Sequence, residues 1–459
     1  MSTIHSERAH EILKQRDKVS HHDTTFWQLR QGRDKMAKSL PEWESLRDHA
    51  SAIKRHTLTH LADYLEQFSS QLESRGVIVH WAKDANELNE MVYGILESHK
   101  VTKMVKSKSM LTEECGLNAY LEQRGIDVVE TDLGERILQL MHRAPAHIVV
   151  PAMHITKEEV AETFEAKGIS ADKGNTDPTY LTYCARKSLR HEFMEAGAGL
   201  TGCNFGVAKT GDIVVCTNEG NADMTTSMPK LHIVTMGIEK LVPDYESLAV
   251  FQRLLCRSAT GQPTTGFTSH FRQARPGAEM HVVLLDNWRS DALANPEHWE
   301  TLKCIRCGAC MNTCPVYRRS TGASYTYFIP GPIGVDLGML ANARRYSDNV
   351  SACSLCLSCD NVCPAEVKPG SQIYLWRQSL DGIGKADHLK KFMSEGMELL
   401  FDHPTLYTDA LKLSPLANFV PEMLTHYSHL NPWGLGHAKP KFASQSFHGW
   451  WKEQQNKKK

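Results

Sequence analysis

The chain has 459 residues, more than one hydrophobic core usually supports, so two or three domains are expected. Hydrophobic residues make up 41% and charged residues 23%, a balance that excludes a disordered or fibrous protein. Lysine plus arginine, at 52, nearly cancel aspartate plus glutamate, at 53, so no global field indicates binding to nucleic acid or to an anionic membrane.

The N-terminal part predicts helices. Residues 1–72 form an N-terminal helical segment in this prediction, because Leu58, Leu61, Leu65 and Phe68 recur three or four residues apart. The first residues are polar and lack the apolar stretch of a secretory signal, and no later run approaches the roughly 20 apolar residues of a spanning helix. We therefore expect a soluble, cytoplasmic protein.

Residues 73–290 predict an α/β domain, since short β-rich runs alternate with helical stretches. Such alternation is typical of parallel strands joined by helical crossovers. The runs on which this rests are 77–81, 87–96, 103–105, 111–121, 126–129, 148–150, 212–216, 232–235, 247–256 and 281–286. Polar, turn-forming residues between 286 and 302 indicate a domain boundary there.

A glycine-rich stretch resembles a nucleotide-binding motif. Gly197, Gly199 and Gly202 spell GxGxxG, and Glu219 follows at about the distance of a ribose-binding acid. A dinucleotide fingerprint must follow a strand and open a helix, whereas 188–196 predicts a helix that runs into the glycines. We interpret the glycines as a helix stop and a tight turn.

Glu219 also follows the expected strand 212–216, a place where α/β proteins collect ligand-binding groups. It is a candidate nucleophile or base. The alternative is a turn built by Asn218, Gly220 and Asn221, with Glu219 solvated.

The histidines give no further site. Those in the α/β region, such as His154, His232, His270 and His281, show no HExxH or other paired spacing, so a mononuclear metal site is not expected.

The cysteines carry the strongest motif. Two runs with the pattern CxxCxxCxxxCP are typical of [4Fe-4S] ligation, in which the fourth cysteine of each run binds the other run's cluster. One cluster would take Cys304, Cys307, Cys310 and Cys363, and the other Cys353, Cys356, Cys359 and Cys314. Structural zinc is the alternative, but it uses pairs of cysteines and has no role for a third closely spaced one.

The segment between the two runs, 316–352, is longer than a compact β-rich ferredoxin needs, so residues 291–400 predict a mainly helical ferredoxin-like domain. The other cysteines lack ligand spacing, and we interpret them as small buried hydrophobes. They are Cys115, Cys184, Cys203, Cys216 and Cys256.

Several phrases between about residues 185 and 376 resemble one family, that of the lactate-utilisation iron-sulfur protein B. They are LRHEFMEAGAGLTGCNFGVAKTGDIVVCTNEGN, LHIVTMGIEK, RSATGQ, HVVLLDN, CIRCGACMNTCPVYR, GPIG and CSLCLSCDNVCP. The phrase LNPWGLGHAKPKFASQSFHGWW is similar to the family's C-terminal segment, so residues 401–459 are expected to form a family-specific tail. Two positions differ from the family pattern: Lys209 replaces an acid, and Trp288 replaces a glycine.

The resemblance implies a LUD domain with the open α/β fold of sugar-phosphate isomerases and CoA transferases, joined to a module with two [4Fe-4S] clusters. It also implies partners, namely a second cysteine-rich iron-sulfur subunit and a further LUD-domain subunit, which together oxidise L-lactate to pyruvate. Only the eight motif cysteines are carried over as functional residues.

Three hypotheses follow. The chain is an electron-transfer subunit, or its LUD domain itself binds a small hydroxycarboxylate near Glu219, or that domain is a docking scaffold.

Overall fold

The computed structural model describes residues 4–385, 388–421 and 439–457. Contacts along the chain divide it into two units, Met1–Ile383 and Gly384–Lys459. Within the described ranges, no helix combines the length and the apolar character needed to cross a membrane.

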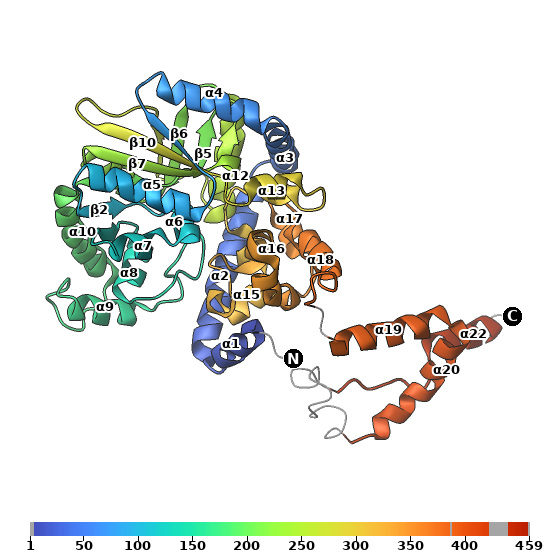
Figure 1. The fold of residues 1–459 in the computed structure, drawn as a ribbon. Helices are drawn as coiled ribbons and strands as arrows, with labels where there is room; N and C mark the ends of the chain where they lie inside the picture. Colours follow the sequence, from blue (N-terminus) through green and yellow to red (C-terminus); the bar gives the residue numbers. More distant parts are fainter. Residues whose placement is uncertain (1–3, 386–387, 422–438, 458–459) are drawn as a thin grey trace. The chain divides into compact units, whose positions relative to one another are not determined.

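A six-stranded parallel sheet organises the first unit (Figure 1). Its strand order is β1-β10-β7-β4-β2-β3, and every neighbouring pair is parallel. Most of its residues are buried, which explains their nearly continuous apolar sequence. The strands are β1 (Ile78–Ala82), β2 (Lys103–Lys106), β3 (Asp127–Glu130), β4 (Ala198–Thr201), β7 (Leu231–Gly237) and β10 (Glu279–Leu285).

Helices and a smaller sheet cover the two faces. One face packs on α5 (Ala85–Ser98), α6 (Met110–Cys115) and α7 (Leu117–Glu122). The other face packs on α4 (Leu61–Glu73) and on a four-stranded sheet of order β8-β5-β6-β9. These strands are β5 (Phe205–Val207), β6 (Asp212–Thr217), β8 (Leu241–Val242) and β9 (Phe267–Phe271). The α/β prediction is confirmed.

Further helices complete the α/β part. The first three of these six helices pack their apolar faces against one another or against β2 and β3, and the fourth packs on β4. The fifth contacts the N-terminal helices, and the sixth contacts the start of the cysteine-rich region. They are α8 (Leu133–Leu140), α9 (Lys157–Ala166), α10 (Pro178–Glu195), α11 (Asn221–Ser227), α12 (Tyr245–Ala259) and α13 (Arg289–Ala294).

Two expectations for this domain are wrong. The GxGxxG stretch contains a central strand, β4, rather than a tight turn; Gly199 lies within it because α11 packs so closely that a Cβ would stand 1.9 Å from the carbonyl oxygen of Thr225. The expected strand at 148–150 is an irregular loop. Its apolar side chains pack against the cysteine-rich module instead of joining the sheet.

The cysteine-rich module is helical, as predicted, with no strand among its described residues. Its elements are η2 (Trp299–Lys303), α14 (Ala309–Thr313), α15 (Pro315–Ser320), η3 (Gly322–Ser324), α16 (Gly331–Tyr346), η4 (Ser347–Ala352), α17 (Ser358–Val362) and α18 (Pro369–Ser379).

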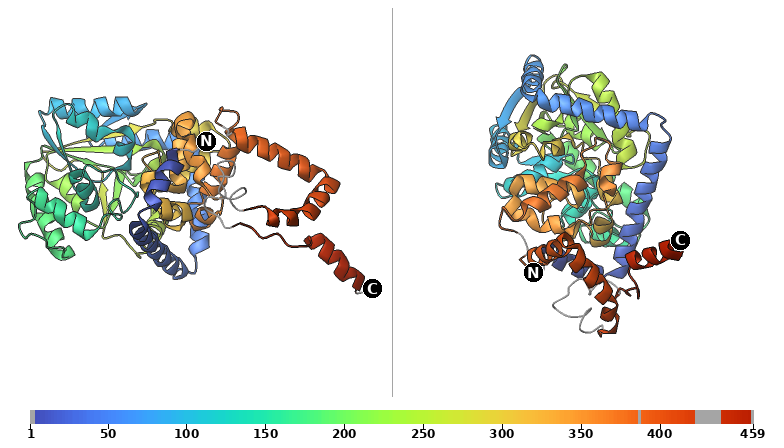
Figure 2. Two further views of the ribbon diagram at one scale, coloured as in Figure 1. Left: turned by 90° about the horizontal axis from the view of Figure 1, so that it is seen from below. Right: turned by 90° about the vertical axis from the view of Figure 1, so that its right-hand side faces the viewer.

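The N-terminal helices join this module to the sheet domain (Figure 2). They are α1 (Ile4–Leu13), α2 (Arg16–Lys38) and α3 (Trp43–Thr59). One continuous core contains Phe26 of α2, Phe251 of α12 and Tyr317 of α15, all buried. The first unit therefore holds the sheet domain and the cysteine module together.

The second unit contains α19 (His388–Asp402), α20 (Pro404–Leu413), η5 (Ser414–Phe419) and α22 (Phe447–Lys457). Residues 430–438 of the C-terminal phrase quoted above lie outside the described residues.

Candidate functional site

The two cysteine runs fold in the same way. Residues two and four positions after the first cysteine of each run have positive φ: Arg306 (60°) and Gly308 (76°), then Leu355 (54°) and Leu357 (56°). These left-handed residues curl both loops at the same positions. A short helix follows, α14 in the first run and α17 in the second. The sequence duplication is thus also a structural one.

The fold brings the first predicted ligand set together. Cys304, Cys307, Cys310 and Cys363 line one cavity, although Cys363 belongs to the second run. The other predicted set gathers around Cys314, whose thiol pKa is raised to about 11 by burial, and also by the nearby Cys353 and Cys356.

The two groups adjoin each other. Burial raises the pKa of Cys359, and so do the neighbouring Cys310 of the first group and Cys314. The hydroxyls of Thr313 and Ser358, on α14 and α17, lie 2.5 Å apart.

The donor chemistry fits two iron-sulfur clusters. Burial raises the pKa of the Cys307 and Cys310 thiols well above the ordinary range, and metal coordination would remove this cost of forming thiolates. Backbone amides donate to Sγ of Cys304 (3.4 Å), Cys353 (3.3 Å) and Cys363 (3.3 Å). Such hydrogen bonds stabilise the charge on cluster sulfurs.

Arginines of the N-terminal helices add positive charge around the cysteines. Arg33 of α2 donates to the carbonyl of Val362 at 3.0 Å, and Arg47 of α3 donates to the carbonyl of Cys363 at 3.0 Å. Their positive charges offset the negative charge of a thiolate-bound cluster. Helices α2 and α3 therefore bring two arginines to the second cysteine run, while the apolar face predicted at the N-terminus packs mainly on the sheet.

A cavity of about 330 Å³ lies at the carboxyl ends of the parallel strands. This is where open α/β sheets bind their ligands. The segments that follow β2, β4 and β7 contribute Lys108, Asn204 and Lys240. The end of β6 contributes Thr217, and the turn after it contributes Glu219. The cavity is therefore built from strand ends, as such sites are in related architectures.

The same cavity borders the first cysteine group. Arg306, between Cys304 and Cys307 in the chain, lines it, and Ile148 lines both this cavity and the one formed by the cysteines. The cavity and the first cysteine group thus share a wall at Ile148 and Arg306.

Glu219 lines the cavity, and it also lies exposed in the turn after β6, as the alternative interpretation expects. Its carboxylate accepts a hydrogen bond from the backbone amide of Leu133 at 3.2 Å. Although Glu219 is exposed, partial desolvation of its carboxyl group, together with the charge of Asp132, raises the pKa of Glu219 to about 7. A carboxyl with this pKa can exchange a proton near neutral pH.

A buried ion-pair network forms the floor next to the cavity. Arg289, 1% exposed, binds both oxygens of Glu114 at 3.0 Å and donates to Glu239 at 2.6 Å. Burial alone would raise the pKa of Glu239, but Arg289, Lys240 and Arg306 outweigh it and lower the pKa to about 2. Glu239 is therefore ionised, and the network is a fixed charge arrangement.

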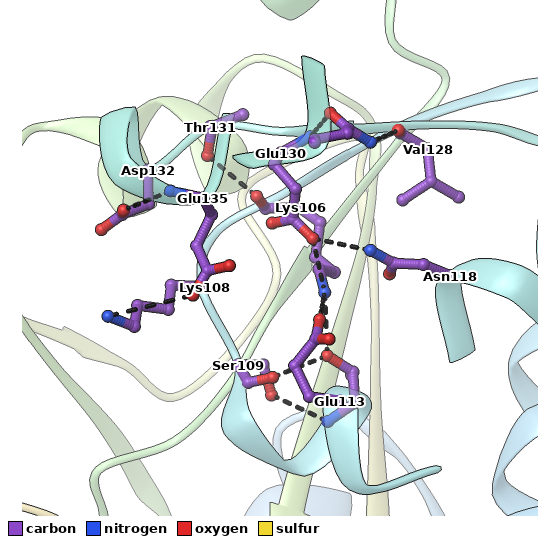
Figure 3. Close-up of polar contacts among 12 residues, drawn as sticks. Lys106, Lys108, Ser109, Glu113, Asn118, Val128, Glu130, Thr131, Asp132 and Glu135 are labelled. Carbon is purple, nitrogen blue, oxygen red and sulfur yellow. Dashed lines mark hydrogen bonds and ion pairs between the residues drawn. The ribbon is translucent and has the colours of Figure 1, made fainter. Parts of the chain in front are cut away.

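A second network holds the ends of β2 and β3 (Figure 3). Lys106, 1% exposed, lies 2.7 Å from Glu130 and 2.9 Å from Glu113, and Asn118 donates to Glu130 at 2.7 Å. Lys108 donates to the carbonyl of Val149 at 2.9 Å, so it ties the sheet edge to the loop beside the cysteines. This network positions the cavity wall rather than filling the cavity.

Sequence reasoning missed most of these charged residues. They come from separate elements: Glu114 from α6, Glu239 from the 3-10 turn after β7, Arg289 from the start of α13 and Arg306 from the first cysteine loop. Only the positions of Glu239 and Arg289 soon after strands, and of Arg306 between cysteines, could have signalled them.

The two departures from the family pattern lie away from the cavity lining. Trp288 has φ 83°, a left-handed conformation that favours glycine, and its ring stacks on Arg289 with the guanidinium 4.7 Å from the ring centroid. Lys209 donates its backbone amide to Pro243 at 3.0 Å.

Comparisons with known proteins match both parts of the chain. Residues 65–285 match the LUD domain family, and residues 300–367 match the 4Fe-4S dicluster domain family, which implies two [4Fe-4S] clusters. Lactate utilization protein B from Oceanobacillus iheyensis is 39% identical over 451 residues, covering 93% of this chain and 91% of that protein.

Two other relatives are similar over comparable lengths. Lactate utilization protein B from an Exiguobacterium species is 40% identical over 85% of this chain and 84% of that protein. The uncharacterized electron transport protein YkgF from Escherichia coli is 36% identical over 93% of this chain and 92% of that protein.

Proposed function

Since this chain belongs to the lactate utilization protein B family, we propose that it is the iron-sulfur electron-transfer subunit of an L-lactate-oxidising complex. One [4Fe-4S] cluster is held by Cys304, Cys307, Cys310 and Cys363, and the other by Cys353, Cys356, Cys359 and Cys314. The observation that carries the proposal is the wall shared by the cavity at the strand ends and the first cysteine group, at Ile148 and Arg306.

The arrangement supports a direction of electron flow. The first cysteine group adjoins the cavity, and the second adjoins the first through α14 and α17. At the far side, Cys356 is exposed and Leu357 is 44% exposed. Electrons enter from the cavity side and leave through the second group to a partner.

The partners in this proposal are a second cysteine-rich iron-sulfur subunit and a further LUD-domain subunit. An exposed cysteine ligand with an apolar neighbour suits a transient redox contact, since electron-transfer interfaces are small.

The cavity favours a second candidate function, oxidation of a small hydroxycarboxylate in this chain itself. Lys240 and Arg306 would bind the substrate carboxylate, and Glu219 would accept a proton. Oxidation of lactate to pyruvate releases two electrons and two protons. The two oxidised clusters would each accept one electron, Glu219 would accept one proton, and the second proton would pass to water. Binding of lactate to the isolated holoprotein, lost in Glu219→Gln, would favour this function over a purely electron-carrying one.

The test is iron and sulfide content after anaerobic purification, with EPR after dithionite reduction and growth on lactate. We expect about eight irons per chain and magnetically coupled signals. Cys304→Ser should lose a cluster and growth on lactate, whereas Cys184→Ala, at a buried cysteine outside both runs, should retain both. Zinc in place of iron, or normal growth of Cys304→Ser, would contradict the proposal.

A further inference from the structure

Three side chains from two distant parts of the sequence meet at the amino-terminal edge of the central sheet, away from the cavity at its carboxyl edge. His99 follows α5, and Glu279 and His281 begin β10. The Nε2 atoms of His99 and His281 lie 3.2 and 2.6 Å from the same oxygen of Glu279. All three ligand atoms lie within 4.8 Å of one another.

We propose that His99, Glu279 and His281 form a binding site for one divalent cation of the zinc class. Two imidazole nitrogens and one carboxylate oxygen are a zinc donor set, with a water molecule in the fourth position. Magnesium and calcium prefer oxygen ligands, so the two histidines select against them.

The other nitrogen of each imidazole is already held. Nδ1 of His99 lies 2.8 Å from the carbonyl oxygen of Ile95, and because a carbonyl only accepts, this nitrogen carries the proton. Nδ1 of His281 lies 2.9 Å from Nε2 of His80. Metal-binding histidines usually have such outer partners, which orient the ring and fix its tautomer.

The facing atoms of His99 and Glu279 suit a cation. Nε2 of His99 lies 3.2 Å from a carboxylate oxygen of Glu279, and because Nδ1 of His99 is bonded to the carbonyl of Ile95, Nε2 is the nitrogen that would coordinate the metal. The His99 position at the C-terminal end of α5 adds the negative end of the helix dipole.

The ligands can adjust to the metal. Tetrahedral zinc with bonds of about 2.0–2.1 Å needs ligand atoms somewhat more than 3 Å apart. The side chain of His281 is 6% exposed and fixed, whereas those of His99 and Glu279 are 34% and 44% exposed, so these two can move by the small distance required.

The experiment equilibrates anaerobically prepared holoprotein with Zn²⁺, dialyses it and measures zinc and iron per chain. Wild type and His191→Ala, a control at an exposed histidine of α10, should hold one zinc in addition to the full iron content. His99→Ala and Glu279→Gln should lose that zinc and keep the iron. His80→Ala should bind it about 10–100-fold more weakly, because the outer partner of His281 is gone.

X-ray absorption at the zinc edge separates this site from the cysteines. A first shell of nitrogen and oxygen at about 2.0–2.1 Å is expected, whereas zinc on cysteine would show sulfur at about 2.3 Å. The proposal is overturned by a sulfur shell, by the absence of bound zinc, or by equal zinc in wild type, His99→Ala and Glu279→Gln.

Discussion

The backbone amide of Arg306 donates a hydrogen bond to Sγ of Cys304 at 3.4 Å, and the same residue lines the cavity at the strand ends. Its guanidinium lies 3.7 Å from Glu239. A single residue therefore joins the charges of the cavity to the electrostatics of the first cysteine group.

Arg306→Gln should lower the reduction potential of the first cluster by tens of millivolts, on the order of 59 mV per tenfold change in equilibrium. Loss of a nearby positive charge disfavours the reduced, more negative cluster. Arg306→Lys keeps the charge and serves as the control, because every residue but glycine meets the same backbone strain at φ 60°. A potentiometric titration followed by EPR would refute the idea if both variants kept the wild-type potential.

Arg289→Met should destabilise the first unit by about 3–5 kcal/mol, because it leaves Glu114 and Glu239 buried without their cation. Calorimetry would measure the shift of the unfolding transition. Arg253→Ala removes an ion pair with Glu42 in which both side chains are more than 40% exposed, and its effect should stay within about 1 kcal/mol.

The same ion-pair network gives a pH dependence. The folded-state pKa of Glu239 is lowered to about 2, so its stabilising contribution is present above the ordinary glutamate pKa of about 4.3 and is lost as the pH falls toward 2. The difference in stability between wild type and Arg289→Met should therefore shrink over this acidic window. A difference that stays constant from pH 5 to about 2 would mean that Glu239 is not held ionised by the network.

The ligand cysteines and the α/β alternation were predictable because both are local patterns. Cysteines with two or three residues between them on one loop have the spacing of a cluster site. Strands and helices that alternate along the chain each show their own hydrophobic period. The cavity was not predictable beyond Glu219. Glu114, Glu239 and Arg289 meet only because three strands end at one edge of the sheet.

Strand β4 shows why the rest was missed. Its sequence, Ala198–Thr201, is four residues long and includes a glycine, so it carries no β-branched run and follows a helix directly. Tertiary packing against α11 decides its conformation, and such packing has no signature in the local sequence. The apolar run 148–150 was wrongly predicted to be a strand. Side chains buried against another module give the same apolar sequence pattern as side chains buried in a sheet.

Wild type should become less stable as the pH rises because Glu135 must then ionise, and the variant Glu135→Gln should not show this decrease. Burial raises the pKa of Glu135 to about 8, although Lys108 opposes the shift, and among the described residues its Oε1 has no hydrogen-bond partner. Because the folded-state pKa of Glu135 is raised, its contribution to the stability of the protein is fully present below the ordinary glutamate pKa near 4.3. That contribution is lost as the pH rises through 8.

The two proteins should therefore be similar near pH 5 and differ by up to a few kcal/mol near pH 8.5, with the glutamine variant more stable. Thermal unfolding at a series of pH values measures this. Glu122→Gln, at an exposed position of α7, should follow the wild-type curve. Parallel curves for wild type and Glu135→Gln would contradict the buried, neutral carboxyl.

Gly199→Ala should destabilise the sheet domain by roughly 1–3 kcal/mol or more, because an added methyl would stand 1.9 Å from the carbonyl oxygen of Thr225 and force α11 away from β4. Gly94→Ala is the matched control: within α5, nothing lies within 4 Å of the new methyl, so it should stabilise by about 0.8–1 kcal/mol through helix propensity. Urea unfolding measures whether the free energy of unfolding falls in Gly199→Ala and rises in Gly94→Ala. If Gly199→Ala were as stable as wild type, the close packing of α11 on β4 that explains this glycine would be wrong.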